Sequence, residues 1–491
     1  MKLPSRTKIL LIFPIFCLAA ALGACRGGGS DATDSPTPSP SPSPRIITPG
    51  PTTEPPVSEY RLVYREAGAL EDVIWSVAPH DPASKSQLAV IPHREGFSVR
   101  ASVSPDGSYL AYLSLPELAL SADSSQADVY LIDLTALAGE PGAQPVKVAE
   151  TMDYNFIPLW SPDGGLLYMR AYAGPEFLNA RQTIFRVRVF PPRDPAVRTP
   201  IPTPTPEPGI EPWPGPDTTV MSATVANVLR WTPLGFSADE KSMLFLEERG
   251  GTSGQTVVGI YSPARTTEVD ALYDKAEDAW YAAQQINKQA ADEAAANGQP
   301  PPELVTPVPT PAPDARLVVP LSEQSVTDAS LSPDRNKVAY LDQTISDEGD
   351  FVISTHIADM IEATTSVLPL TVLSPGTQLA PCWYPDGRIT MSVLPSSGGP
   401  GQMVIVALGQ SSITMMRQPE SGYDIPWGWA PDGSWLPVLH WSGTSLVEPG
   451  DGRLDMVSAG GHRMTLLEGS ANAGRDSVVG WLKLPAEEAA G

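Results

Sequence analysis

Six aspartates occupy the same place in six copies of a short motif, and carboxylates repeated in this way could ligate a metal ion or transfer protons. They are Asp106, Asp163, Asp239, Asp334, Asp386 and Asp432. Each follows Ser-Pro, Tyr-Pro, Ala-Pro or Ser-Ala and precedes Gly, Glu or Arg. Proline presets φ for a tight turn, aspartate hydrogen-bonds nearby backbone, and glycine accepts a positive φ. We therefore expect each aspartate to stabilise its own turn rather than to bind a ligand.

The other residue types that carry catalysis show no comparable order. The five histidines form no His-x-x-x-His pair and no zinc-ligand spacing. The sequence has no Gly-x-Ser-x-Gly elbow, no Asp-x-Asp-x-Asp-Gly calcium loop, no Walker loop and no dinucleotide fingerprint. Cys382 lies in an expected strand, which favours a buried apolar role over a nucleophilic one. We expect no catalytic residue, no metal and no cofactor.

Tryptophans offer a second candidate chemistry, because their rings stack on sugars and peptides. Trp160, Trp383, Trp427 and Trp429 lie in or near the strands expected to precede motif turns. They could line the mouth of a channel as ligand-face aromatics. The alternative is packing between neighbouring sheets, where large side chains are buried.

An apolar segment follows every motif, so each copy predicts a strand, a tight turn and a second strand. Successive motif aspartates are 57, 76, 95, 52 and 46 residues apart by subtraction. The shortest spacing fits the ~40–50 residues of a four-stranded propeller blade, and the longer spacings leave room for insertions.

The motif resembles the repeat of TolB-like β-propellers, and the form Trp160-Ser161-Pro162-Asp163-Gly164 is typical of that repeat. The resemblance covers most of the chain from about Tyr60 and implies an all-β propeller. Such propellers serve many roles, so the resemblance does not define the function. By the same resemblance a hydrolase head can accompany the repeat, but no α/β segment long enough for one follows Leu484.

The two ends of the repeat region predict how the ring closes. Three expected strands near residues 60–64, 71–77 and 87–91 precede the first motif, and one strand near 477–484 follows the last repeat. Together they would make one composite blade and remove a free sheet edge. We therefore expect seven four-stranded blades, and six if the weak copy at Asp239 is not a separate blade.

Residues 1–24 resemble a bacterial lipoprotein signal, in which Leu22-Gly23-Ala24 comes directly before Cys25. By this resemblance Cys25 becomes the lipidated first residue of the mature chain. An ordinary signal peptide is the alternative. Residues 25–59 are rich in proline, serine and threonine, which predicts a disordered or extended stalk. The protein would then sit on the extracytoplasmic face of the cell membrane, attached through its lipidated N-terminus.

Two insertions interrupt the propeller expected over residues 60–485. Residues 191–216 form a proline-dense loop that no central strand tolerates. Residues 266–314 combine a helix pattern over 268–296 with a second proline-rich stretch. Tyr273 and Trp280 on the apolar stripe of this helix could anchor a partner protein. Packing of the helix on its own propeller is the alternative.

The formal net charge of −24 argues against nucleic acid and against electrostatic docking on anionic lipid. We expect a non-catalytic, lipid-anchored module that binds or scaffolds a protein, a peptide or a glycan. The alternative is a metal-dependent propeller enzyme of lactonase or hydrolase type. A third interpretation is an envelope assembly factor that docks a partner through the helix.

Overall fold

The structure is a computed structural model. It describes residues 45–47, 54–115, 126–134, 145–171, 181–189, 218–224, 228–249, 255–261, 263–300, 305, 318–323, 326–345, 351–368, 370, 376–396, 398–409 and 412–483. The expected signal sequence, Cys25 and the proline-dense stretch 191–216 lie outside the described residues.

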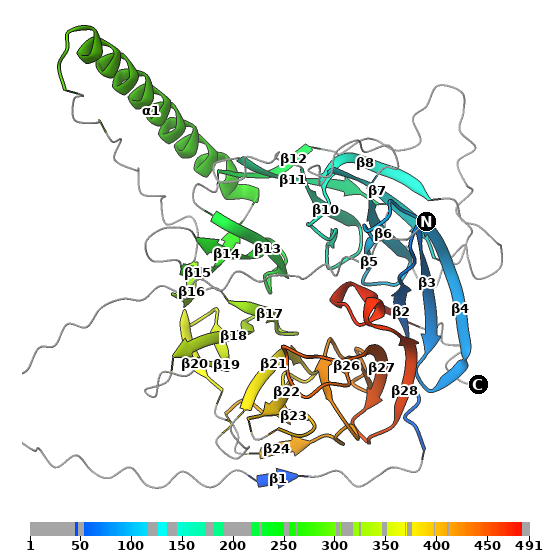
Figure 1. The fold of residues 1–491 in the computed structure, drawn as a ribbon. Helices are drawn as coiled ribbons and strands as arrows, with labels where there is room; N and C mark the ends of the chain where they lie inside the picture. The colour runs from blue at the N-terminus through cyan, green and yellow to red at the C-terminus, as the bar shows by residue number, and fades with distance from the viewer. Residues whose placement is uncertain are drawn as a thin grey trace, which may run out of the picture. The chain divides into compact units, whose positions relative to one another are not determined.

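The described chain forms a seven-bladed β-propeller, and six of the blades begin at a motif (Figure 1). From the inner to the outer strand, blade 1 holds β5 (Arg100–Val103), β6 (Tyr109–Ser114), β7 (Gln126–Asp133) and β8 (Val146–Asp153). Blade 2 holds β9 (Leu159–Trp160), β10 (Leu166–Arg170), β11 (Arg181–Arg188) and β12 (Thr218–Thr224). Blade 3 holds β13 (Val228–Phe236), β14 (Met243–Arg249), β15 (Gln255–Tyr261) and β16 (Val318–Ser322).

The remaining motif-led blades follow in chain order. Blade 4 holds β17 (Thr327–Leu331), β18 (Lys337–Ile345), β19 (Phe351–Asp359) and β20 (Thr364–Val367). Blade 5 holds β21 (Gly376–Trp383), β22 (Ile389–Pro395), β23 (Gln402–Val406) and β24 (Ser412–Met415). Blade 6 holds β25 (Tyr423–Pro426), β26 (Trp435–Trp441), β27 (Gly452–Ser458) and β28 (Arg463–Glu468).

Both ends of the repeat region build blade 7, which confirms the predicted ring closure. Its inner strand is β29 (Val478–Lys483), followed outward by β2 (Tyr60–Glu66), β3 (Glu71–Ala78) and β4 (Asp81–Pro92). β29 and β2 are antiparallel, with Tyr60 opposite Lys483 and Leu62 opposite Trp481. The weak copy at Asp239 begins a blade of its own, so the ring has seven blades.

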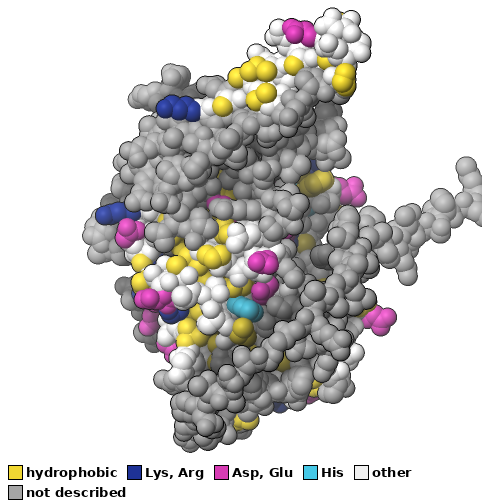
Figure 2. Space-filling view, turned by 90° about the vertical axis from the view of Figure 1, so that its left-hand side faces the viewer, with side chains coloured by type: hydrophobic (Ala, Val, Ile, Leu, Met, Phe, Trp, Pro, Cys, Tyr) yellow, Lys and Arg dark blue, Asp and Glu magenta, His cyan; other side chains and the backbone are white. Residues whose placement is uncertain are grey.

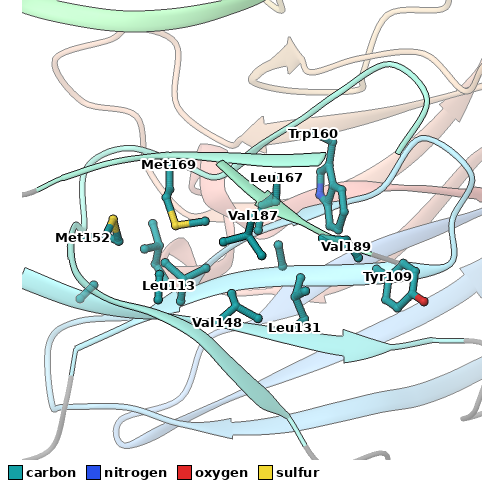
Figure 3. Packing of buried hydrophobic residues seen from close by; sticks show 14 of the residues in the cluster. Tyr109, Leu113, Leu131, Val148, Met152, Trp160, Leu167, Met169, Val187 and Val189 are labelled. Carbon is teal, nitrogen blue, oxygen red and sulfur yellow. The ribbon is translucent and has the colours of Figure 1, made fainter. Parts of the chain in front are cut away.

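The hydrophobic core consists of layers between neighbouring blades. Between blades 1 and 2, Leu113 and Leu131 pack against Leu167 and Met169, all nearly inaccessible to solvent (Figure 3). A blade with neighbours on both sides buries both faces of its middle strands, so β6 is buried along its whole length. This explains why the segment after each motif is continuously apolar instead of alternating.

One strand and one helix extend beyond these blades. β1 (Arg45–Ile47) pairs in parallel with β24, although the sequence predicted only a stalk there. A strand of three residues is too short to carry a periodic strand signal. Helix α1 (Pro263–Ala296) confirms the predicted helix but begins before residue 268. It ends where expected, with Gly298 at φ 65° and the Gln299 amide bonded to Ala294 O at 2.8 Å.

Candidate functional site

All six motif turns share one geometry. The amide of the fourth residue donates to the carbonyl of the first across 2.8–2.9 Å. That fourth residue has a positive φ in each copy; it is Gly107, Gly164, Glu240, Arg335, Gly387 or Gly433. The aspartate accepts the amide two residues on, as Asp163 does from Gly165 at 3.0 Å. The equivalent bonds reach Asp106, Asp239, Asp334, Asp386 and Asp432.

The motif serine strengthens this arrangement where it is present. Ser104 Oγ donates to Asp106 Oδ1 at 2.6 Å, and Ser161, Ser237 and Ser332 make the same bond in their own turns. The hydroxyl of Ser161 is the main cause that lowers the pKa of Asp163. A carboxyl group held ionised is a poor general acid near neutral pH. The motif aspartates are therefore used as hydrogen-bond acceptors within their own turns.

The six turns lie on one side of the propeller, which we call the turn face. Each turn joins an inner strand to the second strand of its blade, and the inner strands of a propeller run in the same direction. The connections between third and fourth strands end on this face too, since the Met360 amide bonds to Asn336 O at 2.8 Å. We call the opposite side, where the other connections lie, the loop face.

Neighbouring turns touch around the turn face. Tyr384 Oη in blade 5 donates to Gly433 O in blade 6 at 3.0 Å. Arg335 in blade 4 pairs with Glu240 in blade 3 at 3.0 Å. The motif residues thus form contacts between blades as well as within them.

Trp383 fastens blade 5 to blade 4 through a reciprocal pair of hydrogen bonds. Its Nε1 donates to Ser330 O at 3.0 Å, and Ser330 Oγ donates to Pro381 O at 3.0 Å. The same pair joins blade 2 to blade 1 through Trp160, Ser102 and Pro158. Both tryptophans are less than a tenth exposed.

Trp429 is also buried, and its Nε1 donates to Thr390 Oγ1 of blade 5 at 2.8 Å. The structure therefore places Trp160, Trp383 and Trp429 between blades, where they offer little surface to a ligand. Their strand positions were predicted, but burial depends on the neighbouring blade. Of the four candidate ligand-face aromatics, only Trp427 is partly exposed.

The other candidate residues are less informative. The Tyr273 and Trp280 side chains lie outside the described residues, so the partner-helix hypothesis remains a prediction. Cys382 is buried, and burial raises the pKa of its thiol, which disfavours the nucleophilic thiolate. Among the described residues, no group of three or more His, Cys, Asp or Glu side chains is placed to hold a metal ion. Nor is any described helix long and apolar enough to cross a membrane.

Blade 6 contains a buried ionic cluster that the sequence did not reveal. Asp424 is inaccessible to solvent and lies opposite His440, with its Oδ1 2.9 Å from His440 Nδ1. Arg463 binds both oxygens of the same carboxylate. Burial favours the neutral acid, but His440 and Arg463 outweigh it and lower the pKa of Asp424. The strand register brings these distant residues together, so no sequence motif marks them.

The Asp424–His440 pair resembles the part of a catalytic triad that orients a base. Within the described structure, however, no hydroxyl or thiol hydrogen-bonds to His440. Arg463 also occupies the carboxylate and bridges it to Asp455. The cluster is therefore best explained as a cross-strand support of blade 6.

Among the described residues, an open hollow of about 430 Å³ lies along helix α1 beside Gln285 and Lys288, and a groove of about 280 Å³ lies between blades 4 and 5. The charged residues of the groove between the blades, Lys337 and Asp359, are paired with each other. On the face shown in Figure 2, hydrophobic and acidic side chains are interspersed among the described residues. None of these features specifies a ligand.

Comparisons with known proteins give matches only among solved structures. No protein-family model and no curated protein matches the sequence. Similar solved structures include a prolyl endopeptidase (13% identity, TM-score 0.46, 84% of this chain and 50% of that chain). The propeller domain of the Trilobed protease from Pyrococcus furiosus is similar at 9% identity (TM-score 0.45, 86% of this chain and 96% of that chain). TolB from Acinetobacter baumannii matches at 13% identity (TM-score 0.34, 72% of this chain and 65% of that chain).

This chain thus spans half the length of the prolyl endopeptidase. The similar structures include TolB and several enzymes. Likeness at these identities concerns the fold and assigns no activity.

Proposed function

We propose that this protein is a lipid-anchored, extracytoplasmic propeller that binds or scaffolds a protein, a peptide or a glycan without catalysis. Cys25 carries the lipid, and the propeller presents its turn face and its loop face as rigid surfaces.

One observation supports the non-catalytic part of this proposal most directly. The side chains that the sequence offers most repeatedly for chemistry are the motif aspartates and the inner-strand tryptophans. The aspartates hydrogen-bond within their turns, and Trp160, Trp383 and Trp429 hydrogen-bond to the preceding blade. Residues used in this way build a rigid ring, which is a suitable scaffold for recognition.

The anchor is tested by comparing the full chain with its Cys25→Ser variant in a bacterial host. We expect the parent chain to fractionate with membranes and to incorporate an alkyne-labelled fatty acid, and the variant to do neither. Equal labelling of both chains would contradict the anchor.

The binding role is tested by metal content and by cross-linking. An enzyme of lactonase or hydrolase type would retain a stoichiometric divalent metal after gentle purification, whereas we expect none. A photo-cross-linker introduced on the loop face should capture one reproducible partner in the native envelope. Stoichiometric metal together with lactone hydrolysis would overturn the proposal.

A further inference from the structure

We propose that the N-terminal segment of the domain straps the membrane tether to the turn face, so that the turn face lies toward the bilayer and the loop face points away. This inference rests on the proposed lipid at Cys25. It adds which face of the propeller remains open to a partner.

The strap consists of residues 45–47 and 54–59. It contacts two blades before it enters β2 of blade 7. β1 pairs with the outer edge of β24 in blade 5. Trp435 Nε1, in the fully buried side chain that begins β26 of blade 6, donates to Pro56 O at 2.8 Å. The segment is therefore attached at separate points rather than only at its end (Figure 1).

Asp432 provides the main polar attachment. One of its oxygens serves its own turn, as in the other copies, by accepting the Ser434 amide. The second oxygen accepts Ser58 Oγ at 2.7 Å and the Glu59 amide at 3.1 Å. Burial favours the neutral acid, but the bonds from Ser434, Ser58 and Glu59 outweigh it and lower the pKa of Asp432. One motif aspartate thus holds both its turn and the strap.

The strap begins and ends at the turn face, although β1 itself runs from there along β24 toward the loop face. Asp432 lies in a motif turn, and the Ser58 amide donates to Nδ1 of His80, which lies between the third and fourth strands of blade 7, at 3.3 Å. β24 starts at the turn face because it follows a connection between third and fourth strands. β1 runs parallel to β24, so Arg45 also lies at the turn-face end.

The strap shortens the tether. Between Cys25 and Arg45 the chain advances 20 residues, which span about 60 Å at most in polyproline II geometry. Without the strap the tether would run from Cys25 to Tyr60 and reach about 110 Å on the same geometry. The shorter tether restricts how far the propeller can turn over relative to the bilayer.

The long insertions share this face. The connections β11–β12 and β15–β16 join third to fourth strands, so both begin and end at the turn face. The shorter connections of the loop face are free of them; among these, residues 442–451 expose Val447 by 90%. The loop face is therefore opposite the side on which the tether and both insertions join the described strands.

Energy transfer from two single labels to the bilayer tests the orientation. Ile361→Cys places a fluorophore on the turn face and Val447→Cys places one on the loop face; these side chains are 70% and 90% exposed. Cys382 is buried, and the Cys25 thiol would carry lipid, so the new cysteine takes the label. The lipidated full chain is reconstituted into phosphatidylcholine vesicles that contain an acceptor-labelled lipid.

We expect transfer from position 361 to exceed transfer from position 447 at least twofold. Equal transfer, or more from position 447, would overturn the orientation while leaving the anchor intact. The Cys25→Ser chain should not float with vesicles. If the parent chain does not float either, the proposed anchor fails and the orientation fails with it.

Releasing the strap should weaken the orientation. Asp432→Ala removes the strap acceptor together with two turn bonds, whereas Asp106→Ala removes two turn bonds and leaves the strap. We expect the ratio between the two labels to fall toward one in Asp432→Ala and to persist in Asp106→Ala. An unchanged ratio in both variants would show that the attachment at Asp432 does not set the orientation, since β1 stays paired with β24 in both.

Discussion

Arg335 and Glu240 occupy the same turn position in adjacent blades, both at φ 60°, and Arg335 Nη1 lies 3.0 Å from Glu240 Oε1. In the other four copies glycine holds this left-handed conformation. The two copies that depart from glycine are therefore neighbours in space, and their side chains interact. The backbone conformation is retained even though it disfavours side chains larger than glycine.

A glycine-to-alanine change at the fourth turn position should measure the strain of this conformation. At Gly387, with φ 86°, an added Cβ has no atom within 4 Å, so only the backbone opposes it. We expect Gly387→Ala to lower the free energy of unfolding by about 1 kcal/mol. Gly428 is equally open but lacks a positive φ, so Gly428→Ala should stay within about 0.5 kcal/mol of the parent. Urea titrations followed by circular dichroism would check both changes, and equal losses would contradict the explanation.

The pair between Arg335 and Glu240 should contribute little to stability. Both side chains are partly exposed, and exposed ion pairs contribute about 0–1 kcal/mol. A double-mutant cycle with both residues changed to alanine should give a coupling energy within that range. The coupling should decline further in 1 M salt, where the Debye length is about 3 Å. A coupling that is insensitive to salt would point instead to packing.

The hydrogen bonds that join blade 5 to blade 4 through Trp383 should contribute more to the free energy of unfolding than the exposed ion pair does. Trp383→Phe removes the donor to Ser330 O, and the loss of this hydrogen bond should cost about 1 kcal/mol. Trp441 provides a matched control, because its indole nitrogen has no hydrogen-bond partner among the described residues. Trp441→Phe should cost less when both are measured by urea unfolding. Equal costs would mean that ring size, and not the hydrogen bond, matters.

The contribution of Asp432 should depend on pH. Its pKa is lowered in the fold, so its stabilising contribution is present above the unfolded value of about 3.9 and is lost as the pH falls through the lowered value. We expect the difference in Tm between the parent and Asp432→Ala to stay constant above about pH 5 and to shrink below about pH 4. Scanning calorimetry would check this, and a difference that grows in acid would contradict it.

Closure of the ring should depend on β29. A chain truncated before Val478 loses the inner strand of blade 7 and exposes the edge of β2, whose Leu62 and Tyr64 are fully buried in the intact ring. We expect this chain to lose its cooperative thermal transition or to aggregate. A chain truncated after Lys483 retains every described strand and should unfold at the parent temperature. Calorimetry of both chains would decide.

The sequence predicted most of the fold because the motif repeats where the chain must turn. The residue types at 161–164 are enough to predict a turn without any distant contact. The apolar segment after each turn is predictable too, because both faces of a blade are buried. The closure of the ring by blade 7 was also predictable, because the N-terminal part of the propeller has three strands without an inner strand and the C-terminal part ends in a single strand.

Features that depend on distant contacts were not predictable. β1 consists of three residues whose strand character arises only from pairing with β24. The Asp424–His440 pair arises from strand register, and the attachment of Ser58 to Asp432 joins residues 374 positions apart. Residue types alone left a ligand face and packing between blades both open, and the neighbouring blades bury three of those tryptophans.

The pairing of Tyr60 with Lys483 bears on how the strands could be reconnected in a different chain order. In the other six blades a motif turn joins the inner strand to the second strand. In blade 7 no turn joins β29 to β2, because Lys483 and Tyr60 belong to distant parts of the sequence. A short Ser-Pro-Asp-Gly linker between Lys483 and Tyr60, with new ends opened at Gly387, would give a circular permutant with every blade continuous except blade 5. The blade at which the chain enters and leaves the ring is therefore set by the order of the segments along the sequence and not by the fold.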